Sequence, residues 1–445
     1  MMMAGDHRSH TAAPRHAKLG TVLELWFDFS CPYAYLASHH APKLGLAIEW
    51  HPMLLGGVFR GIGAGDGPMS SLSPAKAAHN LRDMHRWAEL LGAPFRMPDA
   101  HPMRTVRALR VVLALAHSRW PDVIRELYAA YWQRADDITD THVIEAALAR
   151  AGVSQADITA ALDRSEDPAI KDDLRRRTDE AIALGVFGAP AWIWRTASAP
   201  LLLWGQDRIE WVKAVAAGWD PDRAPPPEGP RTITAARASS GATLDVFFDV
   251  ASPFAYLGLT QLPALAVATG IVPRLIPILL GALFRDIGQA DVPWFSMPAA
   301  KQRYVGLEMA RWARWWGVAF EQPTTFPQRT VTAQRLCLLA AERGFDQGVR
   351  LATRLGRAMW AEHQNLEDAS TLRSLLDQEQ LPRDWVERTS EPAVKAALIA
   401  NTASARAAGA FGVPTFVVNG RHLFWGQDRL ELVARALAGW VPRGE

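Results

Sequence analysis

Two stretches of the sequence decide the fold: residues 23–40, "LELWFDFSCPYAYLASHH", and residues 244–261, "LDVFFDVASPFAYLGLTQ". Each begins with a short run of aromatic and aliphatic residues, which is typical of a buried β-strand. Helical spacing starts at the proline that follows, because proline is favoured in the first turn of a helix. The residue before that proline is Cys31 in the first stretch and Ser252 in the second. Each stretch therefore predicts a strand–helix junction with a cysteine or a serine just ahead of the helix.

The same motifs occur twice along the chain. The further matching pairs are residues 94–110 with 319–335, 185–194 with 409–418, and 204–219 with 425–440. Blocks that recur in one order predict a tandem duplication of about 200 residues, with each copy long enough to be a domain. We predict a disordered tail at residues 1–20, a first repeat at 21–219, a linker rich in Pro, Ser and Gly at 220–242, and a second repeat at 243–441.

Within each copy the order of patterns predicts an α/β fold. A second strand is expected within residues 46–54 and 271–279, and helical patterns then run from residue 76 to about residue 177 in the first copy. A strand pair and a closing helix follow in both copies. The simplest assembly is a small mixed sheet with a helical region inserted into it. The tryptophan-rich stretch 311–320 is interpreted as core or as the contact between the two copies.

The composition limits the possible functions. Apolar residues make up 49% of the chain and charged residues 21%, as in soluble globular proteins. A formal net charge of +2 gives no reason to expect a nucleic acid or an anionic membrane as a partner. No secretory signal and no membrane span is found in the sequence, and two cysteines make no disulfide framework, so we expect a cytoplasmic protein. The histidines lack metal-ligand spacing, and we expect no metal site.

The residue ahead of the helix is the main candidate for chemistry. A thiol at a helix N-terminus has a lowered pKa, so we expect Cys31 to titrate below the ~8.5 of a free thiol, although the alternative of a small buried apolar residue stays open. A serine hydroxyl at the same place is too weak an acid to ionise, and its useful role is to donate a hydrogen bond to another group's thiolate. Ala34 stands where a C-x-x-C pair would have its second cysteine. An internal dithiol cycle within this motif is therefore excluded.

The repeated motifs resemble a known family. The residues that carry the likeness are "FDFSCPYAYL" and "FDVASPFAYL", "LLGGVFR" and "LLGALFR", "GVFGAP" and "GAFGVPTFVV", and "LLLWGQDR" and "HLFWGQDR". They resemble the DsbA type of thioredoxin fold, and within it the 2-hydroxychromene-2-carboxylate isomerases and the kappa-class glutathione transferases. The resemblance covers nearly all of both copies. It implies two thioredoxin-like domains, each with an inserted helical subdomain, and glutathione as cofactor.

The resemblance also implies roles for individual residues. Ser252 matches the catalytic serine, and Cys31 occupies the same position in the first copy. The prolines Pro190 and Pro414 are expected to be cis, and the backbone of Ala189 and Val413 to pair with the cysteinyl part of glutathione. Asp207 and Asp428 are expected to hold its ammonium, and Gln206 and Gln427 its carboxylate, with helix capping as the open alternative for the aspartates. The remaining residues are Lys76 and Lys301 near the glycine carboxylate, and Arg104, Arg329, Tyr33 and Phe254 at the substrate.

The chain departs from the family pattern in both copies. Arg104 and Arg329 stand where the family has an asparagine, which indicates a more acidic or otherwise altered ligand. We predict a glutathione-dependent isomerase or transferase that acts on a small aromatic or enone-like molecule. The alternatives are a thiol–disulfide oxidoreductase that uses Cys31, and a non-catalytic thioredoxin-like binding scaffold. The second copy keeps more of the family's residues, and we expect the two copies to pack as an intrachain pseudo-dimer.

Overall fold

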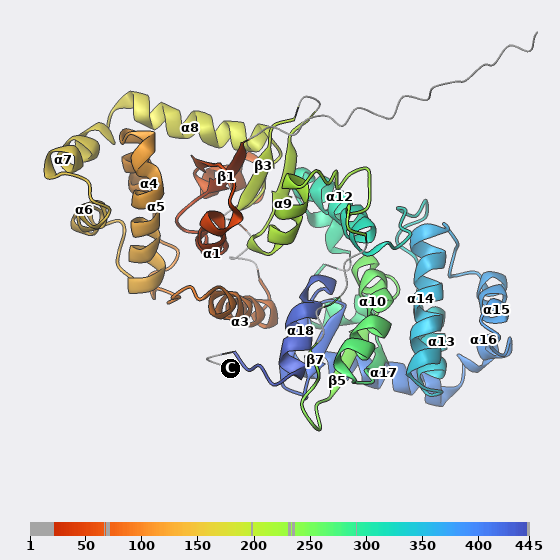
Figure 1. Ribbon diagram of the computed structural model, residues 1–445. Coiled ribbons are helices and arrows are strands. Elements are labelled where there is room, and N and C mark those ends of the chain that lie inside the picture. The colour runs from red at the N-terminus through yellow and green to blue at the C-terminus, as the bar shows by residue number, and fades with distance from the viewer. Residues whose placement is uncertain are drawn as a thin grey trace, which may run out of the picture.

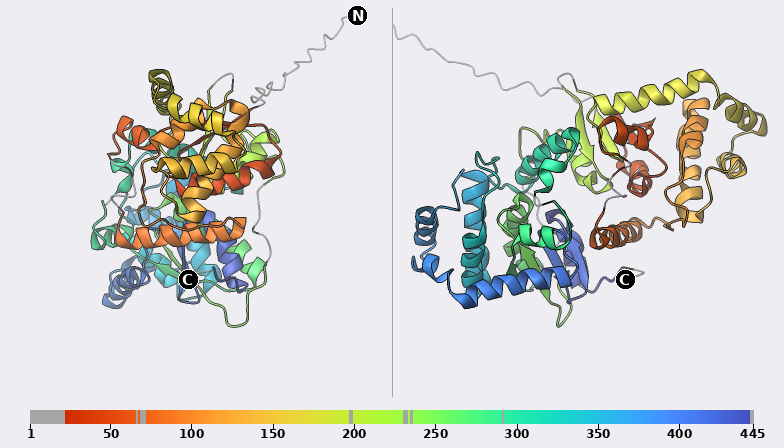
Figure 2. Two further views of the ribbon diagram at one scale, coloured as in Figure 1. Left: turned by 90° about the vertical axis from the view of Figure 1, so that its left-hand side faces the viewer. Right: turned by 180° about the vertical axis from the view of Figure 1, so that it is seen from behind.

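The computed structural model describes residues 22–65, 67, 72–196, 199–229, 233, 236–290 and 292–442. The expected disordered tail at residues 1–20 lies outside the described residues. Figure 1 shows two lobes, one for each repeat, and the two further views in Figure 2 keep the same division. None of the helices within the described ranges has the length and apolar character needed to cross a membrane.

The first repeat is built on a four-stranded sheet with the order β2-β1-β3-β4. Strand β1 (Leu23–Phe27) pairs in parallel with β2 (Ile48–Pro52) and antiparallel with β3 (Ala191–Trp194), which in turn pairs antiparallel with β4 (Leu201–Trp204). The helices are α1 (Pro32–His40), α2 (Leu55–Gly61), α3 (Pro74–Leu91), α4 (Val106–Ala114), α5 (Trp120–Ala129), α6 (Thr141–Arg150), α7 (Gln155–Arg164), α8 (Pro168–Ala183) and α9 (Ile209–Ala216).

The second repeat has the same topology, with the strand order β6-β5-β7-β8. Its strands are β5 (Leu244–Phe248), β6 (Arg274–Pro277), β7 (Thr415–Val418) and β8 (His422–Trp425). Its helices are α10 (Pro253–Thr269), α11 (Leu280–Asp286), α12 (Ala299–Trp316), α13 (Val331–Ala341), α14 (Phe345–Ala361), α15 (Ala369–Gln378), α16 (Trp385–Arg388), α17 (Pro392–Ala407) and α18 (Leu430–Leu437). The predicted fold, a small mixed sheet with an inserted helical region in each copy, is confirmed.

The two repeats contact each other through equivalent elements. Helix α3 of the first repeat lies beside α18, and α12 of the second repeat lies beside α9 (Figure 1). The Arg86 side chain of α3 donates to the carbonyl of Leu423 in β8 at 2.7 Å, and the Arg311 side chain of α12 donates to the carbonyl of Leu202 in β4 at 2.7 Å. These reciprocal contacts relate the two repeats by an approximate twofold axis.

Tryptophans form the apolar part of this interface. The rings of Trp211 and Trp312 lie 4.6 Å apart between centroids, and those of Trp219 and Trp315 lie 5.0 Å apart. All four side chains are buried. The interpretation of the 311–320 stretch as a contact between the copies is therefore correct. Part of the 220–242 segment joins the same interface, since Asp222 accepts two hydrogen bonds from Arg311 at 2.7 and 3.0 Å.

Candidate functional site

Ser252 and Cys31 lie at the N-terminal caps of α10 and α1, where the sequence predicted a strand–helix junction. The Ser252 hydroxyl donates to the carbonyl of Val413 at 3.3 Å and accepts from the backbone N–H of Ala255 at 3.3 Å. The Cys31 thiol donates to the carbonyl of Ala189 at 3.1 Å and makes no capping hydrogen bond. Both side chains are buried. The serine therefore caps the helix with a side-chain hydrogen bond, whereas the thiol donates its hydrogen bond to the neighbouring loop.

The loops that carry Ala189 and Val413 have the predicted backbone geometry. The peptide bonds Ala189–Pro190 and Val413–Pro414 are cis, as expected. Two further cis bonds, His101–Pro102 and Phe326–Pro327, were not predicted.

The expected low pKa of Cys31 is wrong. Burial raises the pKa of the Cys31 thiol to about 12, because the thiolate would lose its water. The backbone N–H groups of Ala34 and Tyr33 favour the thiolate, and the carboxylate of Asp28 opposes it, but burial is the largest effect. The sequence shows the helix end but not the depth of burial. In this structure Cys31 is a protonated, buried thiol.

A buried aspartate organises the junction in each repeat, and the sequence reasoning missed its importance. Asp28 accepts hydrogen bonds from the backbone and hydroxyl of Ser30, from the Thr105 hydroxyl at 2.7 Å and from the backbone of Leu55 at 2.8 Å. Asp249 accepts from Ala251, Leu280 and Thr330 in the same way. Burial raises the pKa of both carboxyls. The sequence feature that could have indicated these aspartates is the Phe-Asp pair that ends both strand motifs.

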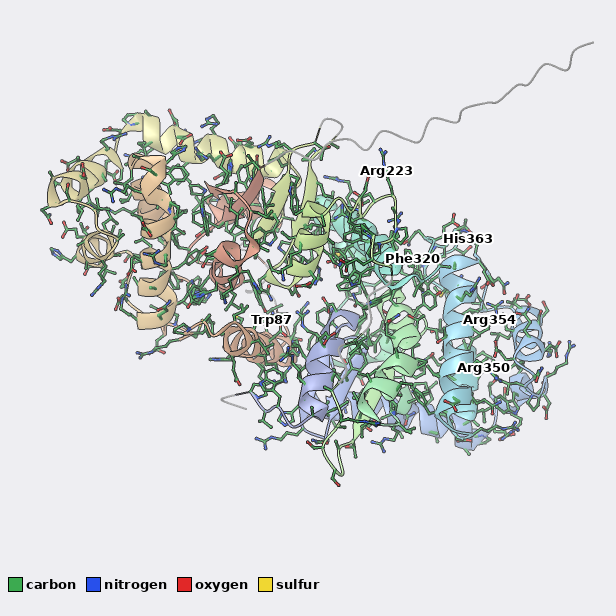
Figure 3. All side chains as sticks on the ribbon, in the orientation of Figure 1. Trp87, Arg223, Phe320, Arg350, Arg354 and His363 are labelled. Carbon is green, nitrogen blue, oxygen red and sulfur yellow. The ribbon has the colours of Figure 1, made fainter. Side chains whose placement is uncertain are left out.

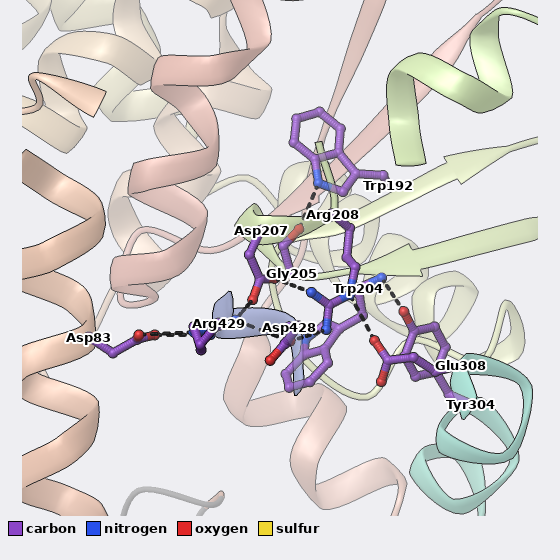
Figure 4. A network of polar contacts seen from close by, with 10 residues as sticks. All are labelled: Asp83, Trp192, Trp204, Gly205, Asp207, Arg208, Tyr304, Glu308, Asp428 and Arg429. Carbon is purple, nitrogen blue, oxygen red and sulfur yellow. Dashed lines mark hydrogen bonds and ion pairs between the residues drawn. The ribbon is translucent and has the colours of Figure 1, made fainter. Parts of the chain in front are cut away.

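The aspartates of the two "WGQDR" motifs lie at the interface between the repeats (Figure 4). Arg208 contacts Asp207 at 3.2 Å and Asp428 at 2.8 Å. Arg429 contacts Asp207 at 2.7 Å and Asp428 at 3.1 Å. The four side chains thus make a closed ring of alternating charge, which we call the interface ring. Each arginine contacts the aspartate of its own repeat and that of the other repeat.

Two further carboxylates hold the arginines from outside. Asp83 of α3 accepts two hydrogen bonds from Arg429 at 3.1 Å each, and Glu308 of α12 accepts one from Arg208 at 2.9 Å. Burial would raise the pKa of Asp207, but Arg208 and Arg429 outweigh it and lower that pKa. The pKa of Glu308 is raised, chiefly by burial. The cluster of two arginines and four carboxylates has an excess of acid, which suits a cationic group as an additional partner.

The two candidate lysines lie against the opposite repeat. The Lys76 ammonium is 5.3 Å from the ring centroid of Trp425, and the Lys301 ammonium is 5.9 Å from that of Trp204. Burial, with repulsion from Lys301, lowers the pKa of Lys76 to about 8. Burial also lowers the pKa of Lys301. Neither ammonium has an ion-pair partner among the residues that the structure describes.

Several buried donors near these lysines also lack an acceptor within the described part of the chain. They are the indole N–H groups of Trp204 and Trp425, the side-chain amide of Gln206 and the ring N–H of His79, whose other ring nitrogen likewise has no donor in that part of the chain. The Trp425 indole packs so closely on the loop before Pro414 that a Cβ at Gly412 would lie 2.6 Å from its nitrogen. His79 of α3 lies 5.2 Å from Phe411 of the same loop, measured between ring centroids. Unsatisfied buried polar groups are uncommon, and here they lie beside two equivalent loops: Trp204 packs against Gly188 in the first repeat, and Trp425 packs against Gly412 in the second.

The remaining predicted site residues divide into two groups. Tyr33 and Phe254 follow the cap residues and are half-buried, and the charges of Asp83 and Arg429 act on the Tyr33 hydroxyl. Arg104 and Arg329 are exposed and stand immediately before the threonines that bind Asp28 and Asp249. Gln206 and Gln427 are buried beside the ring. The structure therefore buries the cap residues and the glutamines, gathers Asp207 and Asp428 at the interface, and leaves the two arginines exposed.

Two aromatic side chains pack beside the segment that leads from β5 to Ser252. The Trp360 indole donates to the carbonyl of Val250 at 2.8 Å, and Phe320 stacks on Trp360 at 6.2 Å between centroids. A groove of about 520 Å³ runs beside Phe320. Figure 3 places Phe320 in the second lobe near His363, with Arg350 and Arg354 farther along α14, and places Trp87 of α3 close to the second lobe.

Comparison with known proteins gives consistent matches. The family model described as DSBA-like thioredoxin domain matches residues 22–215 and 243–438. Glutathione S-transferase kappa 1 of Rattus norvegicus is 27% identical over 202 residues, which cover 42% of this chain and 88% of the rat protein. The 2-hydroxychromene-2-carboxylate isomerase of Sphingobium xenophagum is 29% identical over 198 residues, covering 43% of this chain and 95% of the isomerase. A solved 2-hydroxychromene-2-carboxylate isomerase aligns at 23% identity with a TM-score of 0.40, over 44% of this chain and 94% of that structure.

Proposed function

The chain belongs to the DsbA-like thioredoxin domain family, and we propose that it is a glutathione-dependent isomerase or transferase acting on a small aromatic or enone-like substrate. The relatives that it matches are enzymes, and their names include a glutathione transferase and an isomerase. One fold supports many reactions, so the side chains of the site decide which reaction this chain performs.

One observation carries the proposal: the Ser252 hydroxyl is buried at a helix N-terminus and directed at the loop before Pro414. A helix N-terminus favours negative charge, and a hydroxyl there donates a hydrogen bond without having to ionise. A thiolate placed between the Ser252 hydroxyl and the first turn of α10 would therefore be stabilised. The second repeat offers this arrangement with no competing thiol of its own.

The residues around the site fit glutathione. Glutathione carries two carboxylates and two amide carbonyls. The Ser252 site presents the buried indole N–H of Trp425, which lacks an acceptor within the described residues, and the Lys76 ammonium beside that ring. The corresponding groups of the first repeat are Trp204 and Lys301, together with the amide of Gln206. The ammonium of glutathione fits the excess of acid around Asp428 and Asp207. The N–H and C=O of Val413 are suited to pair with an extended peptide. These features support the predicted roles of the lysines, glutamines, aspartates and backbone groups.

The reaction requires little else from the protein. Glutathione supplies a thiolate that adds reversibly to a conjugated carbonyl and so permits rotation about the former double bond. Ser252 holds the sulfur in its ionised form, and α10 contributes its positive end. The half-buried Phe320 ring, which stacks on the buried Trp360, is proposed to supply an apolar surface for a planar ring of the substrate. The exposed Arg104 and Arg329 are proposed to contact acidic groups at the rim of the substrate.

The oxidoreductase alternative has less support. A thiol whose pKa lies near 12 holds almost no thiolate at neutral pH, and the thiolate is the reactive form. The chain's other cysteine, Cys337, is buried in α13 of the second repeat.

The test combines binding with turnover. Titration calorimetry should detect glutathione binding to the full chain, and a conjugated cis-enone should isomerise only when glutathione is present. Binding without turnover of any such compound would favour the scaffold alternative. Thiol–disulfide exchange that persists after removal of Ser252 and disappears with Cys31 would instead support the oxidoreductase.

A further inference from the structure

We infer that the two ammonium-binding aspartates are coupled across the interface, so that Asp207 of the first repeat sets the ligand affinity of the Ser252 site in the second. This inference rests on the proposed function, because it takes Asp207 and Asp428 as the groups that receive the ammonium of glutathione. The affinity of each site for its ligand would then depend on an aspartate of the other repeat.

The coupling follows because the two aspartates share the same two arginines as ion-pair partners. Asp207 and Asp428 draw on the same two guanidinium groups, and both arginines reach Oδ2 of Asp428, at 2.8 and 3.1 Å (Figure 4). A ligand ammonium at Asp428 must therefore compete with two cations for one carboxylate. How strongly those cations hold Asp428 depends on how much of their charge Asp207 already balances.

Burial makes the competition effective. Between 4% and 14% of each of the six charged side chains in and around the ring is exposed. Charges shielded from water and salt interact much more strongly than surface pairs. The outer carboxylates Asp83 and Glu308 hold Arg429 and Arg208 in place, and the Trp87 ring lies 5.6 Å from the Arg429 guanidinium. The arginines therefore cannot turn to solvent when one aspartate changes its partner.

The direction of the effect can be derived. Removing the charge of Asp207 leaves both arginines with Asp428 as their remaining shared partner, so they hold it more tightly and a ligand ammonium binds less well. By the same reasoning, an ammonium that occupies one aspartate displaces the arginines toward the other. The second ligand in the chain should then bind more weakly than the first, which is negative cooperativity within a single polypeptide.

The test uses the full chain with glutathione as the probe. Calorimetry measures binding, and the ultraviolet absorbance of the thiolate is the second readout. Because Cys31 is protonated, this absorbance reports the glutathione sulfur at the Ser252 site. Asp207→Asn should weaken binding at the Ser252 site on the order of ten-fold, within the usual range of site–site coupling. Asp83→Asn, which removes an outer carboxylate from Arg429, should weaken it in the same direction and serves as the second variant if the first does not fold.

Asp222→Asn is the matched control. It breaks another aspartate–arginine pair between the repeats, the one with Arg311, whose hydrogen bonds within the described residues go to Asp222 and the Leu202 carbonyl and not to the four side chains of the ring. We expect it to leave glutathione affinity within about two-fold of the native value, since distant sites act independently. Unchanged affinity in a folded Asp207→Asn or Asp83→Asn chain overturns the coupling alone. Absence of glutathione binding in the native chain overturns the proposed function and this inference together.

Discussion

Ser252 and Cys31 occupy equivalent positions and direct their side chains at equivalent carbonyls, those of Val413 and Ala189, at 3.3 and 3.1 Å. The geometry of the two sites is thus nearly the same, and the chemistry of the donor atom differs. A hydroxyl can donate a hydrogen bond to a thiolate that comes from outside, whereas the buried thiol places a sulfur of the protein's own at that position. The duplication therefore pairs one site suited to an external thiol with one that carries its own.

The first prediction separates these sites by turnover. Ser252→Ala should lower glutathione-dependent turnover by roughly 10- to 150-fold, because it removes one charge-assisted hydrogen bond worth about 1.5–3 kcal/mol. Glutathione affinity should change little, since Asp428, Gln427 and the Val413 backbone are untouched. Steady-state kinetics together with calorimetry measure both quantities.

Cys31→Ala is the control for that measurement and should have the smaller effect. If Cys31→Ala abolishes activity and Ser252→Ala leaves it intact, the two sites have been assigned the wrong way round.

The second prediction concerns the reactivity of Cys31. Iodoacetamide at pH 8 should label the native chain far more slowly than a free thiol, and denaturant should expose two reactive thiols. The folded pKa of about 12 lies above the unfolded value near 9, so this group stabilises the fold below pH 9 and loses that contribution as the pH rises toward 12. Alkylation rate against pH, read by mass spectrometry of the Cys31 peptide, gives the midpoint. A midpoint below pH 9 would contradict the buried, protonated thiol.

Local sequence patterns were enough to predict the backbone elements that carry the site. The strand, the cap residue and the proline that starts the helix adjoin one another in sequence, and each follows from its own residue type. The cis bonds before Pro190 and Pro414 were predicted because the repeated motifs resemble a family that has them. Recurrence of the blocks in one order then placed both copies of the site.

Long-range charge and burial could not be predicted in the same way. The "WGQDR" motif shows that Asp428 is followed by Arg429 but not that Arg208, 220 residues earlier, donates to the same carboxylate. Lys301 was assigned to its own repeat's site, and the structure places it against Trp204 of the other repeat. For Cys31 the sequence shows that a helix begins at the next residue, but it does not show how deeply the thiol is buried. The first two depend on how the two repeats pack and the third on how the first repeat folds around Cys31, and no local pattern encodes either.

The third prediction tests the close packing beside Val413. Gly412→Ala would place a Cβ 2.6 Å from the Trp425 indole nitrogen, so the buried ring must move. We expect a loss of about 1–3 kcal/mol in stability, as for overpacked cores, and weaker glutathione binding because Lys76 rests on that ring. Thermal unfolding and calorimetry check the two effects.

The matched control is Gly281→Ala in α11, where the nearest atom to an added Cβ is an arginine nitrogen at 3.8 Å. It should be neutral or slightly stabilising, because alanine is the better residue inside a helix. Equal effects of the two substitutions would show that the Trp425 contact has no special importance.

The last prediction is a pH dependence set by Lys76, tested with S-methylglutathione because this probe has no thiol that ionises. The Lys76 ammonium has a pKa of about 8, below its ordinary 10.5, because it is buried and faces Lys301. Its charge is therefore lost as the pH rises through 8, and the affinity for a carboxylate ligand should fall about ten-fold between pH 7 and pH 9. Calorimetric titration across that range measures the change.

Substitutions assign the effect to this residue. Lys76→Arg should keep its charge throughout and remove the part of the pH dependence that exceeds the titration of the probe's own ammonium, whereas Lys76→Met should bind weakly at every pH. The free protein should respond in the opposite direction. Since the unfolded chain binds the proton more tightly between pH 8 and pH 10.5, the Lys76 contribution to folding stability rises with pH in that window, and Lys76→Met should remove the rise. A flat binding profile in the native chain from pH 7 to pH 9 would show that Lys76 does not hold the ligand.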